Sequence, residues 1–170
     1  MTVRVRRATP ADTDRIVELI YDLAEYEKLR DRCTVTSDQL GRSLFGPTPA
    51  VFAHVAEEDG GGGTDVGAAR VVGIAVWFLT YSTWDGVHGI HLEDLFVAPD
   101  HRGGGAGTAL LAELARECVD KGWTRLAWDV LDWNEPSIAF YDSLGARPST
   151  EWIGYRLTDE PLRQLANYRG

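Results

Sequence analysis

The sequence predicts an α/β fold, which can equally be described as α+β, with a mixed central β-sheet flanked by helices on both faces. Two strand-like segments, residues 89–97 and 125–131, are apolar on both of their alternating faces, as central strands covered on each side are. A helical pattern that ends at Lys121 separates them. The length of 170 residues suits one core, so we expect a single domain over residues 1–170.

The first helix is indicated by its opening residues and by its apolar stripe. A short strand-like start at residues 1–7 precedes Thr9, which supplies a capping hydroxyl, and Asp12, an acid three residues after the cap. The stripe consists of Ile16, Leu19, Ile20, Leu23, Tyr26 and Glu27. Glu27 therefore lies where a core side chain is due. It is either an acid of a pocket or a side chain that returns to solvent at the helix end.

A hairpin with a long glycine-rich loop is expected in the first half of the chain. Residues 51–56 alternate as a strand does, and residues 71–79 form a nearly continuous apolar run. Between them, the four consecutive glycines at 60–63 interrupt any periodic pattern, which indicates a flexible surface loop rather than a domain boundary.

The second half of the chain alternates strands with helices. Its expected elements are, in chain order, a strand at 89–97, a helix ending at Lys121, a strand at 125–131, a capped helix at 134–144, a strand near 152–157 and a helix that opens at Asp159. The first of these helices carries its apolar residues on one face, at Leu110, Leu111, Leu114 and Cys118.

The net charge excludes several classes of partner. The chain has 17 Lys and Arg residues against 26 Asp and Glu residues, which gives a formal net charge of −9. DNA, RNA and anionic membranes require clustered positive charge, so we expect neither a nucleic-acid partner nor a membrane partner. The net negative charge does not exclude a cationic ligand.

Cysteine usage and hydropathy bear on the compartment. Cys33 and Cys118 lie far apart and outside any C-x-x-C spacing, which predicts neither a disulfide framework nor a zinc site. The N-terminus has no apolar signal core, and no apolar run approaches the length that spans a bilayer. We therefore expect a cytoplasmic protein that is neither exported nor embedded in a membrane.

The most informative segment is the glycine-rich stretch at 102–108. It follows a strand that ends in a Pro turn and it opens an amphipathic helix, so unpaired backbone N–H groups lie at the positive end of that helix. A phosphate or pyrophosphate is the expected ligand, unless the glycines only provide a turn with positive φ angles. The chain has no Gly-Lys-Ser/Thr, and Thr108 stands where the third glycine of G-x-G-x-x-G belongs, which excludes two common nucleotide motifs.

Arg102-x-x-Gly105-x-Gly107 resembles the acetyl-CoA-binding signature of the GNAT N-acetyltransferase superfamily. Six segments resemble the spermidine/spermine (diamine) and thialysine acetyltransferase branch, in order over nearly the whole chain: Tyr26-Glu27, residues 81–84, 92–97, 102–107 and 133–138, and Phe140-Tyr141. Residues 60–63 and 147–154 do not match that branch, which leaves the acceptor open but not the acyl donor. The resemblance implies the GNAT fold, with six to seven strands and splayed central parallel strands.

Two consecutive acids, Glu93 and Asp94, interrupt an otherwise apolar strand, where an ionised carboxylate is costly unless it is paired or faces a wet cavity. Amide formation needs a neutral amine, and a primary amine with a pKa near ~10.4 is protonated at pH 7, so a proton acceptor is required. The resemblance implies that Glu93 is this general base, through a water. The alternative is a buried acid held by an arginine or a backbone N–H. Asp94 points to the opposite strand face unless a bulge intervenes, and the resemblance implies a bulge.

The resemblance also implies a cofactor site and a general acid. Tyr141, seven residues after Asn134 and on the same helix face, matches the acid that protonates the leaving thiolate. Without the resemblance, Phe140 and Tyr141 are packing aromatics and Asn134 is a helix N-cap. The residues that match the acetyl-CoA site are the backbone groups of Leu95, Phe96 and Val97, together with Arg102, Gly103, Gly104, Gly105, Ala106, Gly107, Thr108, Asn134, Glu135, Pro136, Ser137 and Tyr141.

Carboxylates and aromatic faces suit an alkylammonium acceptor. The candidates for the acceptor site are Tyr26, Glu27, Trp84, Glu93, Asp94, Trp128 and Asp129. Asp129 alternates with apolar Ala127 and Leu131 and is therefore another acid in a strand that is expected to be buried. The histidines are predicted to be surface or core residues rather than metal ligands: His54, His88, His91 and His101.

We therefore predict an acetyl-CoA-dependent N-acetyltransferase that releases CoA, needs no metal and acetylates the primary amine of a small molecule. The acceptor is a polyamine or a lysine-like amino acid such as thialysine. Direct transfer in a ternary complex is expected, since neither Cys33 nor Cys118 lies in a motif that would carry an acyl group. The alternatives are a non-catalytic CoA-binding sensor and an enzyme that acetylates a protein amine. The resemblance also implies a homodimer.

Overall fold

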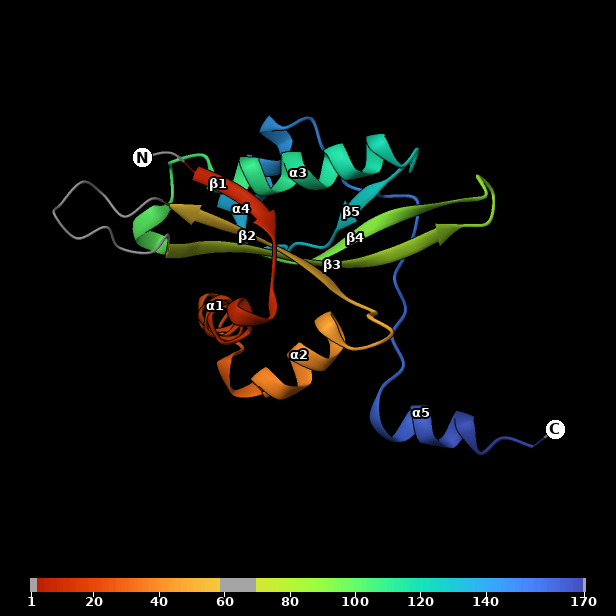
Figure 1. The fold of residues 1–170 in the computed structure, drawn as a ribbon. Coiled ribbons are helices and arrows are strands. Elements are labelled where there is room, and N and C mark those ends of the chain that lie inside the picture. The colour runs from red at the N-terminus through yellow and green to blue at the C-terminus, as the bar shows by residue number, and fades with distance from the viewer. Residues whose placement is uncertain (1–2, 59–69, 170) are drawn as a thin grey trace, which may run out of the picture. The chain divides into compact units, whose positions relative to one another are not determined.

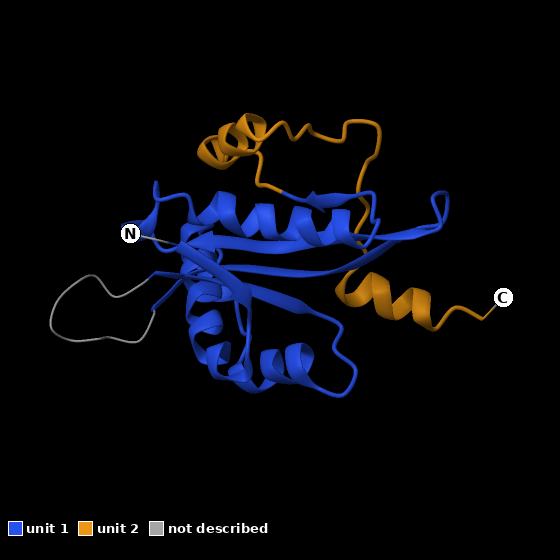
Figure 2. Ribbon diagram, turned by 45° about the horizontal axis from the view of Figure 1, so that its top comes forward, with its two compact units in different colours: residues 1–129 blue, residues 130–170 orange. Residues whose placement is uncertain are grey.

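A computed structural model describes residues 3–58 and 70–169 of the chain. The predicted glycine loop at 60–63 lies outside the described residues. The chain divides into two compact units, Met1–Asp129 and Val130–Gly170, which Figure 2 distinguishes by colour.

The first unit contains a mixed five-stranded sheet in the order β1-β2-β3-β4-β5 (Figure 1). Its strands are β1 (Val3–Arg7), β2 (Phe52–Glu58), β3 (Arg70–Ser82), β4 (Val87–Val97) and β5 (Leu126–Trp128). Neighbouring strands from β1 to β4 pair antiparallel, whereas β4 and β5 pair in parallel. The predicted mixed sheet is confirmed. The predicted count of six to seven strands is wrong for the described residues, which form five.

Helices cover both faces of this sheet, as predicted. α1 (Thr13–Tyr26) and α2 (Ser37–Phe45) lie on one face, and α3 (Ala106–Asp120) lies on the other (Figure 1). α3 contacts all five strands, and α1 contacts β3, β4 and α2. The described residues of this unit also form three short 3₁₀ turns: η1 (Pro10–Asp12), η2 (Arg30–Arg32) and η3 (Pro99–His101).

The start of α1 is fixed by the residues that predicted it. The carboxylate of Asp12 accepts hydrogen bonds from the backbone N–H and the hydroxyl of Thr9, at 2.7 and 2.8 Å. Arg6 on β1 contacts this carboxylate at 2.7 Å and also reaches Glu57 on β2. These contacts hold the pKa of Asp12 down, to about 2, because the Arg6 hydrogen bonds favour the ionised form. Helix start and sheet edge are thus joined by one arginine.

The apolar stripe of α1 and the continuous run of β3 meet in the core. Ile16 and Leu19 on the helix and Ile74 on the strand have no exposed surface. Burial of each such side chain stabilises the fold by about 1.5–3 kcal/mol. On the other sheet face, α3 buries its predicted face at Leu110, Leu111, Leu114 and Cys118.

α2 has no counterpart among the predicted elements, although its sequence carries a signal. Thr36 and Gln39 form a capping box: the Thr36 hydroxyl accepts from the Gln39 N–H, and the Gln39 side chain accepts from the Thr36 N–H at 3.0 Å. Leu40 and Leu44 follow at helical spacing and are buried.

β4 contains a bulge in its centre. Val76 of β3 faces Asp94 and Trp77 faces Leu92, so Glu93 is an extra residue without a partner on β3. The parallel pairing with β5 stops at the same point, since its last pair is Leu92 with Trp128. β4 continues to Val97 with no strand of the described sheet on that side.

β5 corrects the prediction of a central strand at 125–131. It spans only Leu126–Trp128, its residues are half-buried, and it forms one edge of the described sheet. Asp129 and Val130 are exposed, so the chain leaves the sheet where the pairing with β4 ends. The apolar run therefore predicted a strand correctly, but it did not predict that this strand lies at the edge of the described sheet.

The second unit holds α4 (Glu135–Ser143) and α5 (Asp159–Ala166), close to the predicted helices. The strand predicted at 152–157 is wrong: the segment has no ladder partner among the described residues. Its side chains are exposed, with Trp152 at 72%, Ile153 at 82% and Tyr155 at 95%. Alternating apolar residues form a strand only when another strand supplies the hydrogen bonds, which sequence spacing does not guarantee. Within the described residues, no helix is long and apolar enough to cross a membrane.

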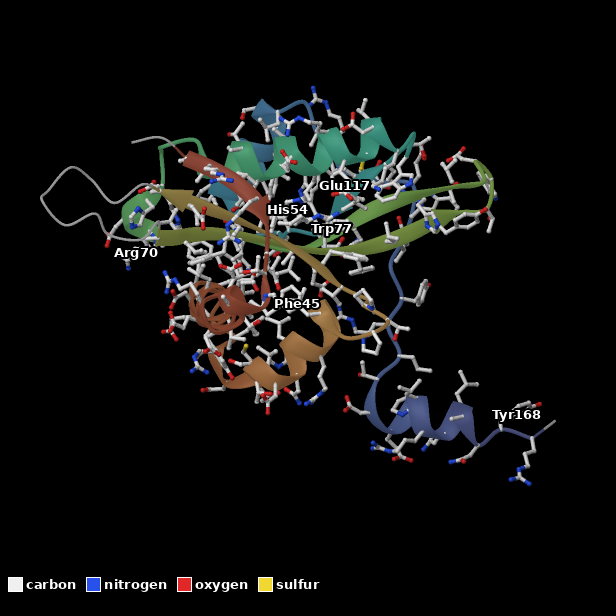
Figure 3. The ribbon with its side chains drawn as sticks, viewed as in Figure 1. Phe45, His54, Arg70, Trp77, Glu117 and Tyr168 are labelled. Atoms are coloured by element: carbon white, nitrogen blue, oxygen red, sulfur yellow. The ribbon has the colours of Figure 1, made fainter. Side chains whose placement is uncertain are left out.

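A buried histidine lies between the sheet and α3. His54 on β2 is 2% exposed, and its Nδ1 accepts a hydrogen bond from the indole N–H of Trp77 at 3.2 Å (Figure 3). Glu117 on α3 lies 4.0 Å from the other ring nitrogen and is paired with Arg7 at 2.5 Å. Burial, and then the positive charge of Arg7, lowers the pKa of His54 to about 4. The folded protein therefore holds a neutral imidazole here.

We expect His54 to make stability depend on pH. Its pKa is about 4 in the fold against 6.5 for a free imidazole, so its contribution is complete above pH 6.5 and is lost as the pH falls toward 4. The loss is at most about 3 kcal/mol. Denaturant unfolding of the wild type and of His54→Gln between pH 7 and pH 4 measures it. The variant keeps an acceptor for Trp77 and removes the titration, so the difference between the two curves isolates His54. Parallel curves would contradict the prediction.

Candidate active site

The glycine loop has the backbone geometry that an anion site requires. Gly103 and Gly105 have φ angles of +78° and +86°, and Gly105 is the N-cap of α3. A Cβ built at either glycine meets nothing within 4 Å, so the left-handed conformation, rather than lack of space, calls for glycine. The first N–H groups of α3, at Ala106, Gly107 and Thr108, have no intrahelical acceptor and carry the positive end of the helix dipole.

Two side chains tie the glycine loop to the rest of the first unit. The Nε–H of Arg102 donates to the carbonyl of Val97 at 2.9 Å, and its guanidinium lies 5.2 Å from the ring centre of Tyr26 and 5.3 Å from that of Phe96. His101 contacts the buried carboxylate of Glu58 at 2.6 Å. The loop is thereby anchored to β4, to the end of α1 and to β2.

The bulge brings three acids together at the end of α1. Asp94 faces Val76, a member of the core under α1, and Glu93 is the extra residue beside it. Burial, together with the negative charges of Glu93 and Glu27, raises the pKa of Asp94 to about 6. Burial also raises the pKa of Glu27, the residue that ends α1. The predicted bulge is thus present, and Glu27 is a partly buried acid near Asp94.

The remaining predicted acceptor residues divide into two groups. Trp128 ends β5 and pairs with Leu92, while Asp129 follows it with a 98% exposed side chain. Trp84 lies elsewhere: it is 88% exposed in the turn between β3 and β4, seven residues of strand from Asp94, or roughly 20 Å. Within the first unit the structure therefore does not bring Trp84 to the acids.

His91 was predicted to be a surface or core residue, and the structure places it among acids. Its Nε2 lies 3.7 Å from Glu93 and 4.0 Å from Asp129. Its ring stacks on Phe78 of β3, with centres 4.9 Å apart. The sequence offered one signal for this contact, the position of His91 two residues before Glu93. The short distance between the two side chains depends on the bulge, which the sequence of one strand does not show.

The second unit holds the predicted residues of α4. The side-chain oxygen of Asn134 accepts a hydrogen bond from the N–H of Ser137 at 3.4 Å, which confirms its N-cap role. Glu135 and Pro136 complete the first turn. Tyr141 lies two turns further along, half-buried, with its ring centre 5.4 Å from that of Phe140.

Comparison of the sequence with known protein families identifies the family of this chain. The profile of the acetyltransferase (GNAT) family matches residues 16–146, a stretch that contains the bulge, the glycine loop and the whole of α4. The chain belongs to the GNAT family. As a member, it is an N-acetyltransferase, and the cofactor of this family is acetyl-CoA.

Two curated relatives of this GNAT protein align over almost its whole length. It is 39% identical to the thialysine N-epsilon-acetyltransferase of Bos taurus, over 96% of this chain and 97% of that one. It is 28% identical to the L-ornithine N5-acetyltransferase of Arabidopsis thaliana, over 97% of this chain and 88% of that one. Among solved structures, an integron cassette protein from the mobile metagenome of V. cholerae has a TM-score of 0.77 at 24% identity, over 99% of each chain, which shows the same fold.

The residues of this GNAT chain fit acetyl-CoA. The open left-handed loop and the N-terminus of α3 suit its phosphates, because backbone N–H groups there have no acceptor within the helix. The edge of β4 from Glu93 to Val97 has no strand beside it in the described sheet, which leaves backbone groups of Leu95, Phe96 and Val97 for an extended ligand. Among the described residues, no group of His, Cys, Asp or Glu is arranged to hold a metal ion.

We expect Gly105→Ala to weaken CoA binding by about tenfold, because a left-handed alanine costs about 1–2 kcal/mol and the relaxed loop would turn N–H groups away from the phosphates. Titration calorimetry with CoA measures the affinity, and thermal melting measures the loss of stability. Gly122→Ala is the matched control, because Gly122, between α3 and β5, is also left-handed, with a φ of +66° and nothing within 4 Å of a built Cβ. It should lose a similar amount of stability and keep the wild-type CoA affinity. Wild-type CoA affinity in Gly105→Ala would contradict the prediction.

Proposed function

We propose that this N-acetyltransferase acetylates the terminal amine of a small amino acid built like lysine, with thialysine as the model acceptor. The observation that carries the proposal is the group of acids at the end of α1 and the β4 bulge: Glu27, Glu93 and Asp94. The charges that act on Asp94 are negative, and its pKa is raised to about 6. A bound ammonium group would supply the positive charge that this group of acids lacks.

The relatives support an amino acid as the acceptor. Thialysine and ornithine, which name two of them, are both amino acids whose side chains end in a primary amine. The identity to the thialysine enzyme extends over nearly both whole chains, so it includes the elements that carry the acids. Polyamines share the terminal ammonium but lack the α-carboxylate, and they are the second class of acceptor to test.

The proposed roles follow from the positions of the side chains. Glu93, with 59% of its side chain exposed, takes the ammonium proton through a water, and Asp94 holds the ammonium group. Backbone groups of Leu95 to Val97 orient the acyl donor along the free edge of β4. The role of Tyr141 in the second unit, to give a proton to the leaving sulfur, rests on the family resemblance and not on its position. Acetyl-CoA, when bound, supplies the acetyl group as a thioester.

Direct transfer to the amine is consistent with the state of the cysteines. Burial raises the pKa of the Cys118 thiol, which therefore stays protonated and is a poor nucleophile. Cys118 lies in the core face of α3, and its Sγ contacts the carbonyl of Arg125 at 3.7 Å. Cys33 follows η2 at the far end of the loop after α1. Neither is among the acids or on the free edge of β4.

A steady-state assay of CoA release tests the proposal. Thialysine, lysine, ornithine, spermidine and putrescine serve as acceptors, and we expect the highest kcat/KM with thialysine or lysine. In Asp94→Asn the KM for the amine should rise about tenfold at pH 8, because a charge-assisted hydrogen bond is lost. In the wild type the KM should rise as the pH falls below about 6, where Asp94 becomes protonated, and the variant should lack this dependence.

Asp120→Asn is the control for the change in net charge, since Asp120 is exposed at the end of α3. It should leave the KM unchanged. A preference for spermidine over every amino acid would reject the lysine-like acceptor but keep the amine site. Absence of turnover with all five amines, despite CoA binding, would reject the proposed function.

We further propose that the protein is a homodimer and that a second copy covers residues 152–168. This segment exposes an unusual number of large apolar side chains, which marks an interaction surface. They are Trp152, Ile153, Tyr155, Leu157, Leu162, Leu165 and Tyr168, with exposures from 44% to 95%. Residues 152–157 also alternate as a strand without a ladder partner in the described chain, and a second copy would supply one.

Sedimentation of the full chain tests the dimer. We expect a dimer for the wild type and a larger monomer fraction for Ile153→Asp and Leu165→Asp, because a buried carboxylate without a partner costs several kcal/mol in an interface. Val119→Asp, which changes another exposed apolar residue (77% exposed, on α3), should stay dimeric. A monomeric wild type at micromolar concentration would exclude the dimer.

A further inference from the structure

The four histidines of the chain have different surroundings, and one of them faces the proposed site. His54 is neutral and buried against Trp77. His101 is paired with the buried Glu58. His88 is exposed and contacts the carbonyl of Thr80. His91 differs from these three, because the two carboxylates nearest to its Nε2 belong to Glu93, the proposed base, and to Asp129.

The position of His91 is set by two neighbouring strands. In β4 it pairs with Phe78 of β3 on one side and with Ala127 of β5 on the other. Its side chain is 23% exposed, and the ring stacks on Phe78 with an interplanar angle of 28°. The imidazole is therefore held in one orientation by packing, whereas the side chains of Glu93 and Asp129 are 59% and 98% exposed.

The bulge accounts for the contact between His91 and the acids. With one extra residue at Glu93, the pair Asp94–Val76 is followed by Leu92–Trp77 and then by His91–Phe78. Because faces alternate along β3, Val76 and Phe78 lie on the same face, and so do Asp94 and His91. The charged groups that face His91 are Glu93 from β4 and Asp129 after β5, while β3 presents Phe78.

The carboxylate of Glu93 and the imidazole of His91 are chemically complementary as proton acceptors. At neutral pH a solvated carboxylate is a weak acceptor for the proton of an ammonium group, whereas imidazole changes charge between about pH 5 and 8. A catalytic base is most effective when its pKa is close to the working pH. The Nε2 of His91 lies 3.7 Å from the carboxylate of Glu93 and 4.0 Å from that of Asp129, so a proton passed on by Glu93 has a nitrogen acceptor beside it.

We propose that His91 is a positioning residue that acts through Glu93, holding its carboxylate and taking up the proton that this carboxylate removes from the acceptor amine. The inference rests on the proposed role of Glu93. An N–H bond of the ammonium breaks and an O–H bond forms on Glu93. That O–H bond breaks as an N–H bond forms at Nε2 of His91, and the imidazolium returns its proton to water. The amine, now neutral, uses its lone pair to form the amide C–N bond as the thioester C–S bond breaks. Its second proton balances the proton that the proposed acid, Tyr141, gives to the leaving sulfur.

The pH dependence of kcat in His91→Ala tests the proposal, with the thialysine assay. We expect kcat to fall at least about tenfold, with a much smaller change in the KM for the amine. The acid limb of kcat between about pH 5 and 8 should disappear from this range, because the imidazole is absent. Added imidazole, which fits the space vacated beside Phe78, should restore much of the rate.

Two further variants keep the outcome clear. His88→Ala removes an exposed imidazole from the same strand and should retain the wild-type kcat and pH profile. His91→Phe preserves the ring that stacks on Phe78 and should lose kcat as His91→Ala does, but without rescue by imidazole. If His91→Ala does not fold, His91→Phe supplies the kcat and pH measurements.

The results separate this inference from the function on which it rests. Glu93→Gln should lose most of kcat, and retention of its activity would reject Glu93 as the base. If Glu93→Gln is inactive but His91→Ala and His91→Phe keep the wild-type kcat and acid limb, the role of His91 is rejected and that of Glu93 stands. Loss of kcat in His91→Ala with no rescue and an unchanged acid limb would also reject it, since packing alone would explain the loss.

Discussion

The extra residue in β4 is the constraint on which the candidate site depends. With Glu93 inserted opposite the Val76–Trp77 step, β4 keeps its ladder with β3 along its whole length but loses β5 after Leu92. One backbone irregularity therefore has two results. It turns Asp94 and His91 toward the same face, and it leaves the edge from Glu93 to Val97 for a ligand. In a regular strand, Asp94 and His91 would lie on opposite faces of the sheet.

Local signals predicted local structure well. The Thr9–Asp12 start of α1, the Asn134 cap of α4 and the left-handed glycines before α3 are each fixed by a few neighbouring residues, so their sequences sufficed. The length of β5 and the absent strand at 152–157 depend on which strand lies alongside, and apolar spacing does not contain that information. Glu93 and Asp94 were predicted as site residues because acids are unusual in an apolar strand. The bulge was expected only from the family resemblance, and no role in the site was predicted for His91.

The net charge of −9 is distributed unevenly over the described acids. Arg6 balances Asp12 and Glu57, Arg7 balances Glu117, and His101 contacts Glu58. These pairs join strands and helices and are structural. At the bulge, by contrast, Asp94 feels the charges of Glu93 and Glu27, so the fold carries electrostatic strain there that a cationic ligand would relieve. Acids of the first kind stabilise the fold, and acids of the second kind form the proposed site for the ammonium group.

The continuity of β4, η3 and α3 has a consequence for how such an enzyme can diversify. The proposed donor groups, from Leu95 to Thr108, lie on one uninterrupted stretch of backbone, whereas the acids near the bulge come from α1, β4 and the end of β5. On this stretch the proposed donor site consists mainly of main-chain groups, which most side-chain substitutions outside the left-handed glycines hardly alter. The proposed acceptor site uses side chains from three separate parts of the fold, each replaceable on its own. Selection for a new amine can therefore act on Glu27 or Asp129 while the use of the same acyl donor is inherited unchanged.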